Sequence, residues 1–206
     1  MANILLTGFA PFAGRSVNAS WIAASLLQKH LNQTKVLAIE IPVVWGEPQR
    51  IMSETIRDFD PQVIIAMGEG KPGCIQLETL ALNQRVQRPD NNGSLPTQTA
   101  INPDGPICVK SSSPLADIRN LLVEKGIPII LSLDAGGFLC EETLYILESQ
   151  CAQQPNSRLV MFVHLPPYGS SLIFKGCQRV CDDDLLLEFS IDLFEIVTLN
   201  SGFSNC

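Results

Sequence analysis

Apolar runs of strand length alternate with amphipathic, helical stretches along most of the chain. Runs that indicate strands cover residues 4–6, 36–44, 63–67, 75–82, 127–133 and 158–164. Apolar residues spaced three and four apart predict helices over residues 21–31, 47–59, 114–125, 138–148 and 185–197. Strands that are apolar throughout and alternate with helices are typical of a mostly parallel sheet with helices on both faces. The pattern therefore predicts an α/β fold.

The stretch from Gln87 to Gly105 interrupts this alternation. It is rich in Pro, Asn, Asp and Gly, which indicates a long surface loop or hairpin. Loops of this length in a compact domain are often functional. The 206-residue chain shows no internal repeat and no linker that would divide it, so we expect one domain over residues 1–206.

Composition and charge argue against some classes of binding partner. The net charge is −7, and an acidic surface argues against nucleic acid or an anionic membrane as the main partner. No apolar run reaches the roughly 18 residues that a transmembrane helix needs. The first residues lack the basic segment and long apolar stretch of a signal peptide. We therefore expect a cytoplasmic protein with reduced thiols.

The cysteines and histidines do not form a pattern that indicates a metal site. The seven cysteines are irregularly spaced and include no Cys-x-x-Cys pair. The two histidines, His30 and His164, are not close to a cysteine pair. We expect neither a disulfide framework nor a zinc site.

Cys140 is the first candidate for chemistry, because of the segment that precedes it. The run Ser132–Cys140 (Ser-Leu-Asp-Ala-Gly-Gly-Phe-Leu-Cys) leads from a predicted buried strand through small residues into a predicted helix. Free N–H groups and the dipole at a helix start favour a thiolate and could hold an oxyanion. The alternative is a core cysteine on an amphipathic helix, because free cysteines are commonly buried.

His164 and Glu78 could supply the partners of a nucleophile. His164 ends an apolar strand, a position where the active sites of open α/β sheets gather, and could act as a general base. Glu78 lies within an apolar strand and must be paired if buried, so it could orient an imidazole as the acid of a triad. A structural histidine and an outward-facing glutamate are the alternatives. Sequence spacing does not show that these residues meet.

Several segments, taken in order, resemble the motifs of pyroglutamyl peptidase I (pyrrolidone-carboxylate peptidase), a cysteine peptidase family. The segment Thr7–Trp21 resembles the family's Thr-Gly-Phe-x-Pro-Phe-Gly-Gly and Asn-Pro-Ser-Trp patterns. Pro89–Gly93 resembles Pro-Asp-Asn-x-Gly, and Asn102–Pro106 resembles Pro-Asp-Gly-Pro. Ser132–Cys140 resembles Ser-x-x-Ala-Gly-x-Phe/Tyr-x-Cys, and Phe162–Pro166 resembles Phe-Ile-His-Val-Pro. The combination covers most of the chain and is specific.

The resemblance implies a fold and an activity. Members of the family are single α/β/α sandwiches, often assembled as tetramers, that remove an N-terminal pyroglutamyl residue from peptides without a metal or organic cofactor. For this chain it implies a three-layer α/β/α sandwich around a mostly parallel, mixed sheet. It also implies a small peptide with N-terminal pyroglutamate as substrate, and a homo-tetramer or dimer.

The resemblance also implies roles for particular residues. The catalytic set matches Cys140 as the nucleophile, His164 as the imidazole and Glu78 as its acid. Phe9 and Phe12 match aromatic residues that help to hold the pyrrolidone ring, and Arg88 lies near an arginine of the family's active site.

The chain departs from the family pattern near the expected substrate. Glu69 stands where the family has Gln or Leu, and the run 70–73 (Gly-Lys-Pro-Gly) replaces Ala-Gly-Gly-Arg. Ala13 and Ala19 replace a usual Gly and Pro. Glu141 follows the cysteine where Asn is frequent, and a carboxylate there would oppose ionisation of the thiol. We therefore place Glu69 in the substrate-binding region and expect the reaction type to be firmer than the substrate.

These observations leave three hypotheses. The first is an active pyroglutamyl peptidase, and the second is a related amidase that acts on another small N-acyl or lactam substrate. The third is a non-catalytic binding protein of the same fold. The intact catalytic set argues against the third hypothesis, while Glu69 and Glu141 keep it open.

Overall fold

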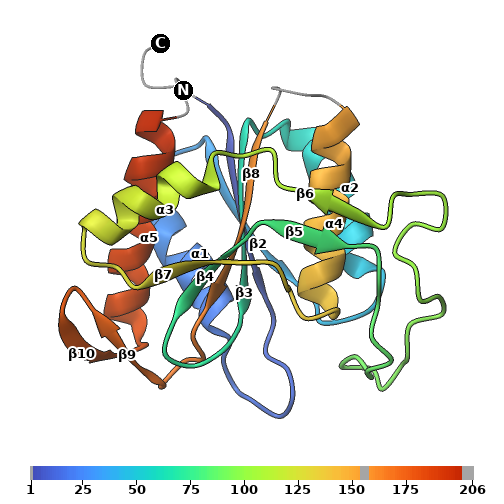
Figure 1. Ribbon diagram of the computed structural model, residues 1–206, viewed down its shortest axis with the longest axis horizontal. Helices are drawn as coiled ribbons and strands as arrows, with labels where there is room; N and C mark the ends of the chain where they lie inside the picture. The colour runs from blue at the N-terminus through green and yellow to red at the C-terminus, as the bar shows by residue number, and fades with distance from the viewer. Residues whose placement is uncertain (1, 154–157, 201–206) are drawn as a thin grey trace.

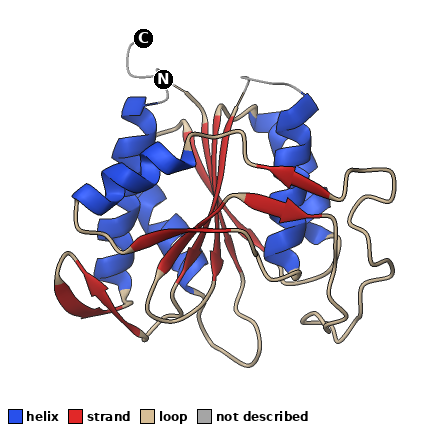
Figure 2. Cartoon of the chain, viewed as in Figure 1, coloured by secondary structure: helices blue, strands red, loops and turns tan. Residues whose placement is uncertain are grey.

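A six-stranded mixed sheet forms the centre of the computed structural model, which describes residues 2–153 and 158–200 (Figures 1 and 2). Its strands are β1 (Ile4–Phe9), β2 (Val36–Ile41), β3 (Val63–Glu69), β4 (Ile75–Glu78), β7 (Ile129–Ser132) and β8 (Leu159–Leu165). They lie in the order β2-β1-β3-β8-β4-β7. The first four strands in this order are parallel, whereas β4 is antiparallel to β8 and β7 is parallel to β4. Two neighbouring strands at one edge therefore run against the rest.

Helices cover both faces of this sheet. One face carries α1 (Ala19–Leu31), α3 (Leu115–Glu124) and α5 (Asp183–Asn200), and the other carries α2 (Glu47–Phe59) and α4 (Leu139–Gln153) (Figure 1). Side chains alternate along the strands, so that Val63 and Ile65 of β3 join the α1/α3/α5 core while Ile64 and Ala66 join the α2/α4 core. The predicted three-layer α/β/α sandwich is confirmed.

The start of α1 is held against the end of β1 by a cap at Asn18. Oδ1 of Asn18 accepts hydrogen bonds from the backbone N–H of Ser20 (3.1 Å) and from its hydroxyl (2.7 Å). The Ser20 Oγ in turn accepts a bond from the N–H of Phe9 at 2.9 Å. A Cβ on Gly8 would lie 2.4 Å from backbone atoms of α1, so only glycine permits this close contact. The cap thus fixes the position of Phe9.

The single strand predicted over residues 75–82 is wrong, because the chain changes sheets within it. After β4 it turns at Thr79 and forms β5 (Leu80–Leu82), which pairs with β6 (Cys108–Lys110). The N–H and the hydroxyl of Thr79 both donate to the carbonyl oxygen of Ser132, each at 2.8 Å. The antiparallel pair β9 (Ser171–Phe174) and β10 (Cys177–Val180) is also absent from the sequence prediction, since these strands are short and only partly apolar.

The predicted long loop is confirmed, because residues 83–107 contain no helix or strand. Asp90 organises it: Oδ1 accepts bonds from the N–H groups of Asn92 and Ser94, both at 2.9 Å, and Oδ2 accepts one from Trp45 N–H at 3.1 Å. Arg85 and the fully buried Glu142 of α4 form an ion pair at 2.9 Å. These contacts hold the loop over the α2/α4 side, where Arg88 lies.

Within residues 2–153 and 158–200, no helix combines the length and the apolar character that crossing a bilayer requires.

Candidate active site

The alternation of strand residues places several polar side chains on the α2/α4 face of the sheet. His164, one residue before the end of β8, is opposite Gly68 of β3 and opposite Gln76 of β4. Glu78 follows Gln76 by two residues and therefore lies on the same face, diagonal to His164. Because β4 runs antiparallel to β8, residues far apart in the sequence meet here.

Glu78 and His164 form a buried pair. Oε1 of Glu78 lies 2.8 Å from Nδ1 of His164, and the two residues are 0% and 7% exposed. The second oxygen of Glu78, Oε2, has no hydrogen-bond partner within the described part of the chain. A buried carboxylate with one partner stabilises the imidazole in its charged form and fixes the orientation of its ring.

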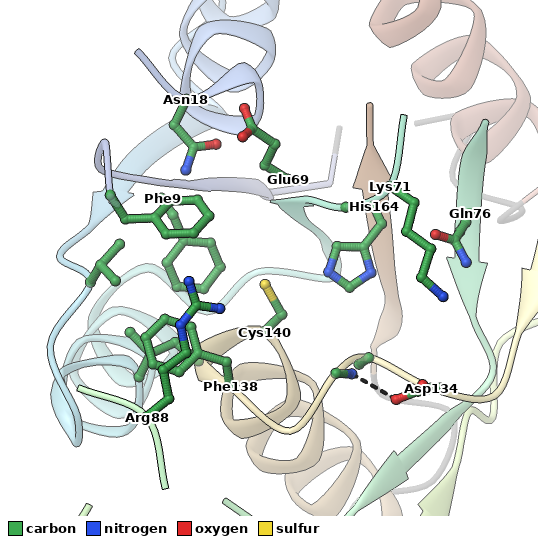
Figure 3. Close-up of a pocket in the computed structure, with 16 residues that line it drawn as sticks. Phe9, Asn18, Glu69, Lys71, Gln76, Arg88, Asp134, Phe138, Cys140 and His164 are labelled. Carbon is green, nitrogen blue, oxygen red and sulfur yellow. Dashed lines mark hydrogen bonds between the residues drawn. The ribbon is translucent and has the colours of Figure 1, made fainter. Parts of the chain in front are cut away.

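Cys140 is the second residue of α4 and faces the imidazole (Figure 3). The connection from β7 turns through Gly136 and Gly137, whose φ angles of 88° and 68° favour glycine. A Cβ on Gly68 would lie 2.7 Å from Cys140 Sγ and 3.1 Å from His164 Cδ2. The sulfur and the imidazole ring are therefore both next to Gly68. The structure thus brings together the thiol, imidazole and carboxylate of the predicted catalytic set.

The surroundings of His164 favour the charged form of its imidazole. Burial lowers the pKa of His164. This effect is outweighed by the negative charge and hydrogen bond of Cys140 and by the Glu78 carboxylate, which together raise the pKa to about 10. A cation at this position stabilises a thiolate on Cys140.

A pocket of about 290 Å³ opens beside the sulfur, and aromatic residues form one side of it. Phe9, Phe12 and Phe138 line the pocket, and Phe9 and Phe138 lie on the same side of Cys140 in Figure 3. The Arg88 guanidinium lies 4.6 Å from the ring centroid of Phe138 and 5.6 Å from that of Phe12. The indole N–H of Trp45 donates to the Arg88 carbonyl oxygen at 2.9 Å, which fixes this residue at the rim. The residues predicted to hold a ring therefore gather next to the candidate nucleophile.

Glu69 also lines the pocket, but its carboxylate points away from Cys140 towards the start of α1 (Figure 3). The side chain is only 2% exposed and forms an ion pair with Arg15. Its Oε2 accepts bonds from the N–H groups of Ala19 (3.2 Å) and Tyr168 (3.4 Å). These partners join the segment before α1 to the segment after β8. Direct contact of Glu69 with substrate stays a prediction.

The carboxylate of Glu141 is directed into the protein between α4 and β5. Oε1 accepts a bond from Leu82 N–H at 2.6 Å, and Oε2 accepts one from Gly137 N–H at 3.2 Å. Burial raises the pKa of Glu141, and the two backbone N–H groups partly offset this effect. Glutamate at the third helical position commonly binds an N–H at the helix start in this way. Glu141 therefore holds the glycine turn that leads to Cys140.

Sequence reasoning does not single out several residues of the site. They are Gly68, Lys71, Gln76, Asp134 and Phe138. Alternation along β4 could have identified Gln76, because it precedes Glu78 by two residues. Gly68 lies in β3, whereas the positions of Lys71, Asp134 and Phe138 depend on the path of loops between distant elements.

An α/β/α sandwich that holds a cysteine at a helix start, against a buried His–Glu pair, has the arrangement of a cysteine hydrolase. A sequence model described as pyroglutamyl peptidase matches residues 2–184. The chain belongs to the pyroglutamyl peptidase family.

Individual relatives agree with this assignment. The chain is 35% identical over 170 residues to the pyrrolidone-carboxylate peptidase of Bacillus mycoides, covering 81% of this chain and 79% of the relative. It is 35% identical over 166 residues to the enzyme of that name from Gloeobacter violaceus, covering 79% and 80%. A crystal structure of Bacillus amyloliquefaciens pyroglutamyl peptidase I superposes with a TM-score of 0.79 at 25% identity, covering 95% of this chain and 96% of the other. A variant of the Pyrococcus furiosus pyrrolidone carboxyl peptidase gives 0.79 at 26% identity, covering 94% and 96%.

Proposed function

We propose that this protein is a cysteine peptidase that removes an N-terminal pyroglutamyl residue from peptides. The observation that carries the proposal is the position of Cys140 at the start of α4, beside the buried His164–Glu78 pair and at the edge of an aromatic pocket. Membership of the pyroglutamyl peptidase family and the names of the relatives support it.

The aromatic side of the pocket suits the pyrrolidone ring. The ring is flat, uncharged and largely apolar, and Phe9, Phe12 and Phe138 offer apolar surface for it. Arg88 packs on two of these rings at the rim, so it stiffens the wall and excludes water. The pocket thereby places the carbonyl carbon of the ring residue next to Cys140.

Acylation begins with attack of the Cys140 thiolate on this carbonyl carbon. Backbone N–H groups in the first turn of α4 have no partner within the helix and can stabilise the oxyanion. The imidazolium of His164 donates its proton to the amine as the scissile C–N bond breaks. The shortened peptide leaves, and pyroglutamate remains attached to the sulfur as a thioester.

Deacylation uses the same groups in reverse. The neutral imidazole of His164 accepts a proton from water, which attacks the thioester carbon. The C–S bond breaks, and pyroglutamate and the Cys140 thiolate are released. Throughout, the carboxylate of Glu78 stabilises the positive charge that forms on the imidazole.

Hydrolysis of a chromogenic pyroglutamyl arylamide tests the proposal. Wild type should hydrolyse it, and Cys140→Ser should lower kcat/KM by roughly 10³-fold or more. Cys108→Ser is the matched control, because Cys108 is exposed and lies outside the pocket, and it should leave the rate unchanged.

Iodoacetamide labelling separates the remaining outcomes. A Cys140 thiol that reacts rapidly at neutral pH, without turnover of any pyroglutamyl compound, would support a related small-amide hydrolase instead. A Cys140 thiol that is inert at neutral pH would contradict both enzymatic functions and favour a binding protein.

The proposal extends to the domain organisation, oligomeric state and cellular location of the enzyme. We expect the chain 1–206 to act as one domain, as a dimer or tetramer, in the cytoplasm. The described cysteines are all free, which suits a reducing compartment. Light scattering of the purified protein would determine the number of subunits.

A further inference from the structure

The pocket continues past Cys140 on the side of His164 that faces away from the aromatic rings. Lys71, Gln76 and Asp134 lie on this side (Figure 3). In the proposed mechanism, His164 donates a proton to the leaving amine. The first residue of the leaving peptide must therefore lie on the same side of His164. This placement rests on the proposed function.

Gln76 presents a buried amide to this part of the pocket. The residue is 8% exposed and stands opposite His164 in the β4–β8 pairing. No described residue forms a hydrogen bond with its side chain, although it lines the pocket. Its amide oxygen and nitrogen are not sealed from the pocket, so the group is available to a ligand. Its donor and acceptor match those of a peptide group.

Lys71 adds a positive charge to the same region. It lies between β3 and β4 and forms no ion pair with any residue in the described ranges. Its side chain extends between His164 and Gln76, whereas Asp134 lies on the opposite wall (Figure 3). Oδ1 of Asp134 accepts a bond from Gly136 N–H at 2.9 Å, which fixes this negative charge. A ligand carboxylate is therefore attracted by one wall and repelled by the other.

We propose that Lys71 and Gln76 form a subsite for the first residue of the leaving peptide and favour a carboxylate on that residue. The amide of Gln76 pairs with the carbonyl group on the α-carbon of that residue, whether it belongs to the next peptide group or to a terminal carboxylate, and the ammonium of Lys71 binds the carboxylate. This carboxylate is either the α-carboxylate of a pyroglutamyl dipeptide or the side chain of an acidic residue. Lys71 lies in the run 70–73, where this chain departs from the family pattern.

Two pairs of peptides distinguish the sources of the carboxylate. Pyroglutamyl-alanine and its amide differ only in the α-carboxylate. The amides of pyroglutamyl-glutamate and pyroglutamyl-glutamine differ only in the side-chain charge. In wild type, kcat/KM measured by mass spectrometry should be about three- to tenfold higher for the charged member of at least one pair.

Variants assign this preference to particular residues. Lys71→Ala should bring the ratio to about one, Lys71→Glu should invert it, and Lys29→Ala, an exposed lysine at the end of α1, should leave it unchanged. Gln76→Met should lower kcat/KM more for peptides than for an arylamide, which lacks the second peptide group.

The possible failures are distinguishable. Equal kcat/KM within both pairs, or a preference that survives Lys71→Ala, overturns the subsite while the proposed function stands. A protein that hydrolyses neither the peptides nor the arylamide overturns the proposed function, and the subsite with it.

Discussion

At the scale of single residues, the site depends on charges that the fold isolates from water. Glu78 is fully buried, and only one of its two carboxylate oxygens has a hydrogen-bond partner among the described residues, His164. His164 is in turn enclosed between this carboxylate and the sulfur of Cys140. Because each charge compensates its neighbour, the loss of one group should change the protonation of the next.

We predict that His164 keeps its proton through neutral pH only while Cys140 is present. In ¹⁵N-histidine NMR spectra, the His164 imidazole of wild type should remain charged at pH 8, because its pKa is raised to about 10. In Cys140→Ala the thiolate is lost while burial continues to disfavour the cation, so the ring should titrate at clearly lower pH. The exposed His30 serves as an internal reference. The same titration curve for His164 in both proteins would contradict the thiolate–imidazolium pair.

At the scale of elements, the site is a contact between the start of α4 and the ends of β3 and β8. Gly68 permits this contact, because a Cβ there would meet Cys140 Sγ at 2.7 Å and His164 Cδ2 at 3.1 Å. Glu141 holds the turn before α4 through Gly137. Its carboxylate therefore has a structural role: it lies between α4 and β5 and binds backbone N–H groups of Leu82 and Gly137.

We predict that Gly68→Ala displaces the thiol. The added methyl group should destabilise the protein by about 1–3 kcal/mol, as overpacking does, and lower kcat/KM by roughly 10²-fold. Chemical denaturation and steady-state kinetics measure the two effects.

A double-mutant cycle identifies the contact that causes the loss. Gly68→Ala should destabilise Cys140→Ala less than it destabilises wild type, because the clashing sulfur is gone. Strictly additive free energies of unfolding would show that the methyl group and the sulfur do not meet.

At the scale of the whole molecule, burial of carboxylates makes stability depend on pH. Glu148 of α4 is 1% exposed and lies outside the catalytic set. Burial raises its pKa from 4.5 to about 6, although the Ser111 hydroxyl and the Ser112 N–H oppose this. The folded protein therefore binds this proton more tightly than the unfolded chain does. The resulting stabilisation is complete below about pH 4.5 and is lost as the pH rises through about 6.

We predict that Glu148→Gln removes this dependence. Between pH 4 and pH 7.5, the free energy of unfolding of the variant should rise relative to wild type by about 2 kcal/mol. Denaturant titrations at the two pH values measure the difference. Glu124→Gln, at an exposed position of α3, is the control. A difference that does not change with pH would mean that Glu148 has the same proton affinity in both states.

The sequence by itself determined the elements, the layers and the candidates for chemistry. Periods of two and 3.6 residues are properties of the local backbone, so apolar spacing revealed most helices and strands. Family motifs added the nucleophile, the imidazole and the acid as expectations. Neither kind of signal contains the order or direction of strands.

Only the tertiary structure decided which residues meet. The reversal of β4, the change of sheet at Thr79 and the pairing of Gln76 with His164 depend on contacts between segments up to 88 positions apart in the sequence. The directions of the Glu69 and Glu141 carboxylates likewise follow from backbone N–H groups that distant loops supply. The physical reason is that strand pairing and burial depend on contacts between residues far apart in the sequence, whereas sequence patterns record only local geometry.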